Sequence, residues 1–189
     1  AACTAGALSL EDAARLVCLR GKLMLESPAG AMSAVYAPEA RVRALLREKN
    51  SALDIAAVNG PAQIVLSGTE FAIEDFEKIC AVESIRVKRL RVSRAFHSRL
   101  MDDLVPEFLS RAQEISFSKP QIPLVSSMSG EVFQDSYSAQ YWANHIRATT
   151  NFYKSMQALE KIGSNAFIEI GPQPVLSQLG KDCLPEANL

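Results

Sequence analysis

The feature that most constrains the fold is a regular alternation of short strand-like and helix-like segments between residues 30 and 92. Runs rich in apolar and β-branched residues predict strands, and amphipathic runs with helix-start residues predict helices. The predicted strands cover residues 31–37, 53–58, 63–67 and 84–92, and the predicted helices cover residues 38–49 and 69–81. The predicted order is therefore strand, helix, strand, strand, helix, strand.

This β-α-β-β-α-β order is typical of the ferredoxin-like unit, so residues 30–92 are predicted to form a small subdomain of that kind. A change of phase near Lys88 and Arg89 predicts a bulge in its last strand. The basic side chains of that strand, Arg86 among them, are expected to form a solvated edge that discourages pairing with another sheet. A phosphate-binding role for them is the less favoured interpretation.

The segments on either side of this unit predict mostly helices. Ser9 and Asp12 resemble a capping box for a helix that ends near Glu26. Pro106 is expected to kink or divide a helix over residues 98–114. Further helices are predicted over residues 137–147, 150–161 and 175–179, and further strands over residues 122–126, 131–133 and 167–170. We therefore predict three parts, residues 1–29, 30–92 and 93–189, in which the outer two form part of one α/β layer.

Composition narrows the classes of function. Apolar residues make up 48% of the 189 residues, and the net charge is −1. This near-neutral balance favours neither nucleic acid nor a membrane surface as a partner. The four cysteines are widely scattered, without the spacing of metal ligands, and the chain has two histidines. We therefore predict no metal site, unpaired thiols and a cytoplasmic location.

One histidine, His97, occupies a predicted junction between a strand and a helix, within Arg94-Ala95-Phe96-His97-Ser98. Such junctions present side chains at the edge of a rigid scaffold, where catalytic groups often lie. Histidine also has an ordinary pKa suited to proton transfer near neutral pH. A packed or solvent-facing loop histidine is the alternative, and position alone favours it.

Arg20 is expected in the middle of the apolar face of the first helix, a face that includes Leu16, Val17 and Met24. A guanidinium stays charged, so at such a position it needs an anion or a path to water. A structural ion pair or a side chain that reaches solvent would meet that need. So would a ligand carboxylate bound through two parallel hydrogen bonds, and the sequence leaves these alternatives open.

Several stretches together resemble one family and follow its order along the chain. They are Leu16-Val17, Arg20-Gly21-Lys22-Leu23-Met24, Gly30-Ala31-Met32, Ala57-Val58-Asn59-Gly60-Pro61, Val65-Leu66-Ser67-Gly68, Ala95-Phe96-His97-Ser98, Tyr141-Trp142 and Glu169-Ile170-Gly171-Pro172. The sequence is similar to the acyltransferase domains of modular polyketide synthases, which resemble malonyl-CoA:acyl carrier protein transacylases. The resemblance implies an α/β fold: a partial α/β-hydrolase-like large subdomain with a ferredoxin-like small subdomain.

The resemblance also implies a reaction and residue roles. In the family a serine takes an acyl group from coenzyme A as an ester and passes it to the phosphopantetheine thiol of a carrier protein. His97 would be the general base, and Arg20 would bind the free carboxylate of a malonyl-type substrate. Phe96 would crowd an α-methyl group and so favour malonyl over methylmalonyl. Asn151 would stand where the family has a polar residue whose backbone carbonyl orients the histidine.

The sequence also departs from the family. No Gly-x-Ser-x-Gly, the motif that carries the family's serine, occurs in it, and residue 1 corresponds to a position shortly after that motif. The family's upstream glutamine-rich loop has no counterpart either, so we expect an N-terminally truncated domain that is inactive alone. Arg94 stands where the malonyl-selecting form of the motif commonly has histidine.

The resemblance implies no cofactor, because coenzyme A brings the acyl group and phosphopantetheine on the carrier protein receives it. The implied partners are malonyl-CoA or a similar acyl-CoA, an acyl carrier protein and neighbouring polyketide synthase domains, with neither nucleic acid nor membrane. Two other functions remain open. One is a non-catalytic module that binds a carrier protein or a synthase domain, and the other is a related thioester hydrolase.

Overall fold

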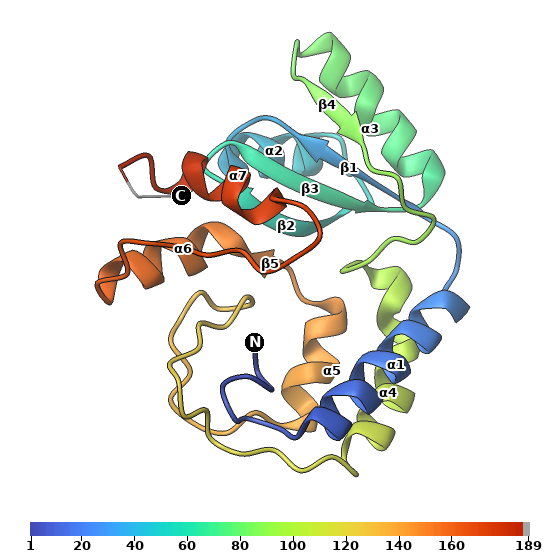
Figure 1. Cartoon of the computed structure of the whole chain (residues 1–189). Helices are drawn as coiled ribbons and strands as arrows, with labels where there is room; N and C mark the ends of the chain where they lie inside the picture. The colour runs from blue at the N-terminus through green and yellow to red at the C-terminus, as the bar shows by residue number, and fades with distance from the viewer. Residues whose placement is uncertain (187–189) are drawn as a thin grey trace.

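The computed structural model describes residues 1–186 and contains a small β-sheet with two helices, set against a body of helices (Figure 1). Its elements, in chain order, are α1 (Leu10–Glu26), β1 (Ala31–Val35), α2 (Glu39–Glu48), β2 (Asp54–Gly60), β3 (Gln63–Gly68), α3 (Glu70–Val82), β4 (Val87–Arg89), the 3-10 helix η1 (Arg99–Leu104), α4 (Val105–Ala112), α5 (Ala139–Arg147), β5 (Thr150–Asn151), α6 (Phe152–Lys161) and α7 (Val175–Cys183).

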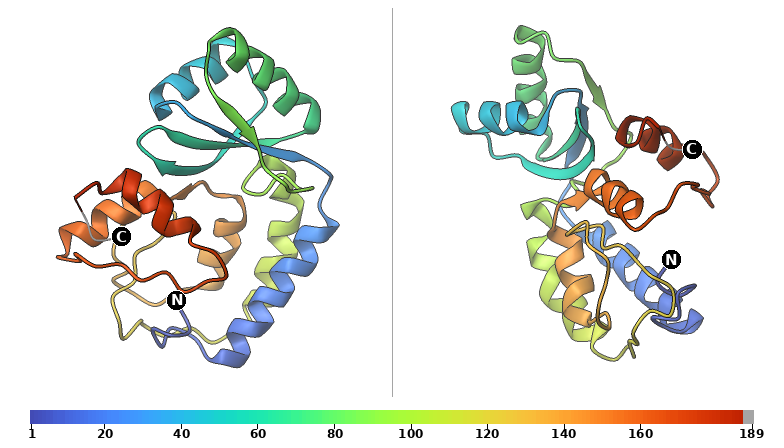
Figure 2. Two further views of the ribbon diagram at one scale, coloured as in Figure 1. Left: turned by 45° about the horizontal axis from the view of Figure 1, so that its top comes forward. Right: turned by 90° about the vertical axis from the view of Figure 1, so that its left-hand side faces the viewer.

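The sheet has the strand order β4-β1-β3-β2-β5. β1 pairs antiparallel with β3 and β4, and β2 pairs antiparallel with β3. This is the order and direction of a ferredoxin-like unit, so the predicted β-α-β-β-α-β arrangement is confirmed. Helices α2 and α3 lie together on one face of the sheet (Figure 2). Between them and the sheet lies a core that includes Val35, Val42, Leu45, Ile64 and Phe76.

The last strand differs from the prediction. β4 covers three residues and has no bulge, and the irregular register occurs in β2 instead, after Ile55 and after Val58. The chain leaves the regular ladder after Arg89 because the following residues run toward the helical body. There the amide of Gly30 donates to the carbonyl of Ser93 at 3.2 Å.

The basic side chains of β4 and its approach are engaged within the small subdomain. Arg89 forms a two-pronged ion pair with Glu77, with both N–O distances at 2.9 Å. The guanidinium carbon of Arg86 lies 3.7 Å from the centre of the Tyr36 ring, a cation–π contact. These contacts favour the structural interpretation of the basic strand over a phosphate-binding one.

The helical body is formed by α1, η1, α4 and α5 around a second core that includes Leu23, Met101, Phe108 and Ile146. Pro106 divides the helix predicted over residues 98–114. The part before it is the 3-10 helix η1, and the proline itself lies in the first turn of α4. A proline is tolerated there because the amide it lacks would have no partner within the helix.

The buried face of α1 is narrower than predicted. Leu16, Leu19 and Leu23 are buried, whereas Val17, which was expected on that face, is 70% exposed. The buried residues recur every three to four positions, so they form one narrow stripe along the helix, which contacts η1 and α4. Arg20 lies at its margin and is half-buried.

The predicted strands outside the small subdomain are mostly absent from the described residues. Residues 122–126 and 131–133 meet only in a single bridge between Val125 and Val132. Residues 167–170 form no strand, and Ile168 and Ile170 are 90% and 96% exposed. A strand needs a neighbouring strand for its backbone hydrogen bonds, and no described segment supplies one there.

The C-terminal elements connect back to the small subdomain. β5 pairs parallel with β2, so the sheet gains a fifth strand from the third predicted part of the chain. Helices α6 and α7 also contact β2. Helix α6 begins after Asn151, which caps it in place of the predicted Thr150. The boundaries predicted near residues 29 and 92 stay predictions.

Candidate active site

His97 stands out in the backbone because its φ angle is +58°, in the left-handed region. Residues other than glycine seldom adopt this conformation, which costs on the order of 1 kcal/mol and is retained where the surroundings fix it. Ser98 supplies part of that fixation. Its buried hydroxyl donates to the carbonyl of Ala95 at 2.6 Å and accepts from the amide of Leu100 at 3.2 Å. The histidine therefore has an ordered turn on both sides.

The imidazole of His97 is oriented by one short hydrogen bond. Its Nδ1 lies 2.8 Å from the backbone carbonyl of Ala148. A carbonyl only accepts, so Nδ1 carries the proton and the lone pair of Nε2 is left to accept another. This is the tautomer that a general base requires.

The carbonyl that orients His97 was predicted near Asn151, and this prediction was wrong by three residues. Helix α5 ends at Arg147, and the chain becomes extended at Ala148, which turns the Ala148 carbonyl away from the helix and toward the imidazole. Asn151 instead caps α6, where its side-chain oxygen accepts from the amide of Lys154 at 3.0 Å. Its described contacts are therefore those of a structural cap.

The structure also brings the second histidine, His145, next to His97 and Arg20. Its Nδ1 lies 3.2 Å from Nη1 of Arg20, and its Nε2 lies 2.9 Å from the hydroxyl of Ser127. Arginine only donates, so Nδ1 of His145 accepts and Nε2 donates to Ser127. The ring centres of His97 and His145 are 5.7 Å apart, edge to face. The position of His145 in the last turn of α5 brings it near His97, a contact between distant segments that no signal in the sequence indicated.

Arg20 is brought next to both histidines. Among the described residues it forms no ion pair with a carboxylate, and its hydrogen bond goes to the neutral ring of His145. Burial lowers the pKa of its guanidinium, although the group keeps its charge. A half-buried cation whose hydrogen-bond partner is neutral keeps an uncompensated charge, which an anion could balance. Of the alternatives left open by the sequence, the internal ion pair is therefore absent from the described part of the chain.

Burial and the nearby Arg20 charge also act on the histidines. Burial and then the charge of Arg20 lower the pKa of His97 to about 4, although its hydrogen bond to the Ala148 carbonyl opposes the shift. Burial, Arg20 and His97 together lower the pKa of His145 to about 4. Both imidazoles are therefore neutral at pH 7, as the hydrogen-bond pattern also requires.

The neighbours of His97 contact both the helical body and the small subdomain. Phe96 is half-buried and packs against the core of the helical body and against a small cluster on the sheet that includes Met32 and Val65. Arg94 donates to the carbonyl of Leu25 at 2.9 Å and so ties this segment to the end of α1, the helix that carries Arg20. These packing roles exist whatever role Phe96 has toward a substrate.

Together these groups bring an unprotonated imidazole nitrogen near a cation. His97 presents the nitrogen, and the half-buried guanidinium of Arg20 contacts the neighbouring His145. Within residues 1–186, no group of three or more histidine, cysteine, aspartate or glutamate side chains could hold a metal ion. No helix in the same residues is long and apolar enough to cross a membrane.

Comparison with known proteins gives matches over nearly the whole chain. The family described as the acyl transferase domain matches residues 1–188. Polyketide synthase GfsA of Streptomyces halstedii is 44% identical over 187 residues, which are 97% of this chain and 2% of that protein. The spectinabilin polyketide synthase system protein NorB of Streptomyces orinoci is 41% identical over 189 residues, which are 98% of this chain and 9% of that protein.

Solved structures agree with the sequence matches. The acyltransferase domain from the second module of the salinomycin polyketide synthase superposes with a TM-score of 0.94 at 42% identity, covering 100% of this chain and 45% of that one. A structure from Streptococcus pneumoniae described as MCAT has a TM-score of 0.91 at 31% identity, covering 100% of this chain and 64% of that one. The chain thus spans less than half of the salinomycin domain and a small fraction of the synthases.

Proposed function

The chain belongs to the acyl transferase domain family, and from this premise we propose that it supplies the base and the carboxylate-binding arginine of a polyketide synthase acyltransferase. The proposed reaction moves a malonyl-type acyl group from coenzyme A to the phosphopantetheine thiol of an acyl carrier protein. The polypeptide that joins these residues to the family's serine motif is called the complete domain below.

In the first proposed half-reaction, Nε2 of His97 accepts the proton of the serine hydroxyl as the oxygen attacks the thioester carbonyl. The tetrahedral intermediate collapses with loss of the coenzyme A sulfur, which takes the proton from the imidazolium. In the second half-reaction His97 takes the proton of the phosphopantetheine thiol as the sulfur attacks the ester carbonyl. The intermediate collapses with loss of the serine oxygen, which takes the proton back from the imidazolium. The hydrogen bond from Nδ1 to the Ala148 carbonyl keeps Nε2 as the accepting atom in both steps.

The observation that carries this proposal is the position of Arg20 beside the two neutral histidines, without a carboxylate partner among the described residues. A malonyl group ends in a carboxylate, which a guanidinium binds through two parallel hydrogen bonds. An enzyme for uncharged acyl groups would gain nothing from a cation at this point. We therefore assign Arg20 to the free carboxylate of the substrate.

Phe96 is proposed to favour malonyl over methylmalonyl, because its ring would crowd an additional α-methyl group. The difference in contact of one methyl group is worth about 1–3 kcal/mol, so the preference is expected to be incomplete. We further propose that residues 1–189 alone form no acyl-enzyme. Intact mass after incubation with malonyl-CoA tests this second proposal, and a stable acyl adduct on these residues would contradict it.

The exchange Arg20→Ala in the complete domain tests the proposed function. It should lower kcat/KM for malonyl-CoA by roughly 10- to 100-fold, the value of hydrogen bonds to a charged group, and leave acetyl-CoA use nearly unchanged. Arg15→Ala is the matched control, because Arg15 lies on the exposed side of the same helix and pairs with Glu11. Equal losses for both substrates would refute the carboxylate assignment. Release of free malonate in place of carrier loading would assign a hydrolase.

A further inference from the structure

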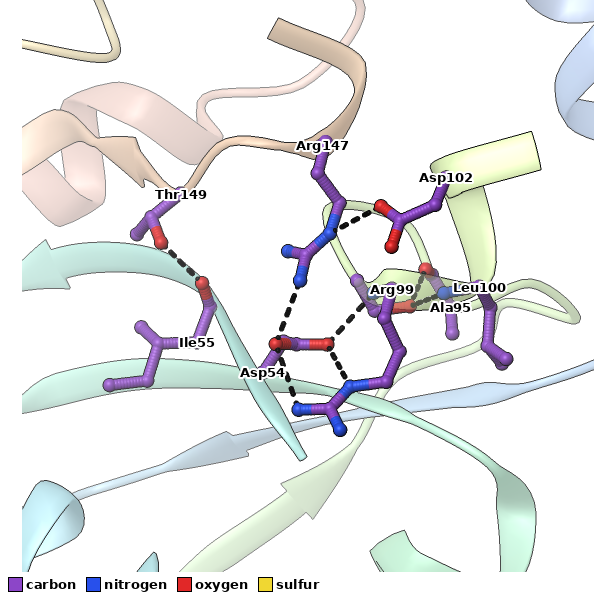
Figure 3. A network of polar contacts seen from close by, with 9 residues as sticks. Asp54, Ile55, Ala95, Arg99, Leu100, Asp102, Arg147 and Thr149 are labelled. Atoms are coloured by element: carbon purple, nitrogen blue, oxygen red, sulfur yellow. Dashed lines mark hydrogen bonds and ion pairs between the residues drawn. The ribbon is translucent and has the colours of Figure 1, made fainter. Parts of the chain in front are cut away.

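Four charged side chains meet where the small sheet faces the helical body (Figure 3). Asp54, the first residue of β2, accepts from Nε of Arg99 at 3.2 Å and from Nη2 of Arg147 at 3.1 Å. Arg147 also pairs with Asp102 at 2.8 Å. The network therefore joins three elements, β2 of the small subdomain and η1 and α5 of the helical body.

The contact of Asp54 with the backbone matters most. The amide of Arg99 donates to Oδ2 of Asp54 at 2.8 Å, and Arg99 is two residues after His97. Arg147 immediately precedes Ala148, whose carbonyl orients the His97 ring. One carboxylate therefore holds the chain on both sides of the hydrogen bond between His97 and Ala148.

Strand β2 also contacts the residues that follow Ala148, whose carbonyl accepts from His97. The hydroxyl of Thr149 donates to the carbonyl of Ile55 at 2.6 Å (Figure 3), and β5 pairs with β2 from Thr150 onward. The segment that carries His97, the donor of this hydrogen bond, is linked to β2 by the Asp54 carboxylate, which accepts from the amide and the guanidinium of Arg99. His97 has the left-handed backbone, which persists only where neighbouring contacts fix it.

We propose that Asp54 is a positioning residue for His97: its carboxylate, on the small subdomain, holds the left-handed turn at residues 97–99 in place against Arg147 and the Ala148 carbonyl. The proposal rests on the proposed function only in naming the reaction that His97 serves. It gives the small subdomain a direct part in that reaction, since β2 sets the direction of the imidazole.

The environment of Asp54 agrees with this role. The side chain is 15% exposed, and although burial raises the pKa of its carboxyl, hydrogen bonds from Arg99 and the charge of Arg147 outweigh burial and lower it. The carboxylate is therefore ionised at neutral pH. Arg99 is 54% exposed, and exposed ion pairs contribute little to stability. The main consequence of the network is therefore expected in the geometry of His97 rather than in the free energy of unfolding.

The test is Asp54→Asn, which keeps the shape of the side chain and removes its charge. Glu77→Gln is the matched control, because Glu77 is a part-buried carboxylate of the same subdomain that pairs with Arg89 away from His97. Nitrogen and proton NMR of the imidazoles reports the hydrogen bond at Nδ1 of His97 without any assay of activity. The chain has two histidines, so its imidazole spectrum is simple to assign.

Asp54→Asn is expected to shift or broaden the Nδ1 proton signal of His97, while Glu77→Gln leaves it unchanged. In the complete domain Asp54→Asn should lower kcat by roughly 10- to 100-fold with little change in KM, since small displacements of a catalytic group have effects of this size. An unchanged His97 signal and unchanged kcat would overturn the proposal. If Asp54→Asn does not fold, Arg99→Gln should shift the Nδ1 proton signal of His97 in the same direction by a smaller amount. The absence of any shift in Arg99→Gln would then overturn the proposal.

The two measurements separate this proposal from the proposed function. If the wild-type complete domain transfers no acyl group but the NMR signal of His97 responds to Asp54→Asn, the proposed function fails and the positioning role stands. If acyl transfer is normal and the signal does not respond, the positioning role fails alone.

Discussion

At the scale of single residues, the site depends on which atoms can donate and which can accept. The Ala148 carbonyl determines the tautomer of His97, and Arg20 determines that of His145. Each ring therefore has one defined proton position, and among the described residues no carboxylate is a hydrogen-bond partner of either ring. This arrangement leaves Nε2 of His97 free to act as the proposed base and Arg20 as the proposed anion-binding group.

Phe96→Ser in the complete domain tests the proposed substrate filter. Removing the ring should raise the ratio of kcat/KM for methylmalonyl-CoA to that for malonyl-CoA by roughly 10-fold, because the crowding of one methyl group is relieved. Phe71→Ser is the control, since Phe71 is 77% exposed on α3. Steady-state kinetics with both thioesters measures the ratio. An unchanged ratio in a folded variant would show that Phe96 serves packing alone.

Sequence reasoning reached some site residues and missed others for physical reasons. Arg20 could be singled out because helical periodicity is local and predicted its charge on an apolar helical face, although it lies at the margin of that face. His145 and Ala148 were not, because their roles depend on where α5 ends relative to a segment about 50 residues earlier. Every residue has a backbone carbonyl, so the side chains do not reveal which carbonyl orients His97. The prediction of a carbonyl near Asn151 therefore depended on the family resemblance alone.

At the scale of elements, β1 and the His97 segment approach each other closely at Gly30. A Cβ on Gly30 would lie 2.7 Å from that of Ala95 and 2.8 Å from the carbonyl oxygen of Gly68. Ala95 is buried and two residues before His97, so neither neighbour can move without shifting the sheet or the site. Glycine at this position allows the small subdomain to contact the histidine segment directly.

Gly30→Ala should therefore destabilise the protein by about 1–3 kcal/mol, the usual effect of overpacking. Gly21→Ala is the matched control, because a Cβ on Gly21 meets nothing within 4 Å and the residue lies inside α1. That exchange should stabilise the protein by about 0.5–1 kcal/mol. Urea unfolding of both variants measures the two effects, and a Gly30→Ala protein as stable as wild type would contradict the close approach.

The elements of the small subdomain could be predicted because each has its own periodicity and its pairing partners lie within the same 60 or so residues. The strand predicted over residues 167–170 illustrates the limit. Its apolar run is strand-like, but whether such a run pairs depends on distant segments, and Ile170 is 96% exposed in this structure.

At the scale of the whole molecule, two half-buried neutral histidines link protonation to folding. The folded pKa of each is about 4, below the ordinary value of 6.5. The unfolded chain therefore binds protons more readily than the folded protein between these values. The stability due to this difference is fully present above pH 6.5 and is lost as the pH falls toward 4.

The free energy of unfolding should accordingly fall between pH 6.5 and 4.5, by on the order of 1–3 kcal/mol. Replacing both histidines, by His97→Asn and His145→Asn together, should remove most of that slope. The carboxyl groups of Asp54 and Glu77 have lowered pKa values and therefore titrate at more acidic pH. The slope between pH 6.5 and 4.5 is accordingly assigned to the histidines. Urea unfolding at several pH values measures the slope, and an equal slope in the double variant would show that the histidines are not its source.

The most direct test of the account is the rate of malonyl transfer to a carrier protein by the complete domain with and without His97→Asn. Asparagine tolerates the left-handed backbone of residue 97 but has no basic nitrogen, so the variant should fold and lose the base. We predict that the single-turnover rate of acyl-enzyme formation falls by roughly 1000-fold or more. A folded His97→Asn domain that forms the acyl-enzyme at the wild-type rate would contradict the account.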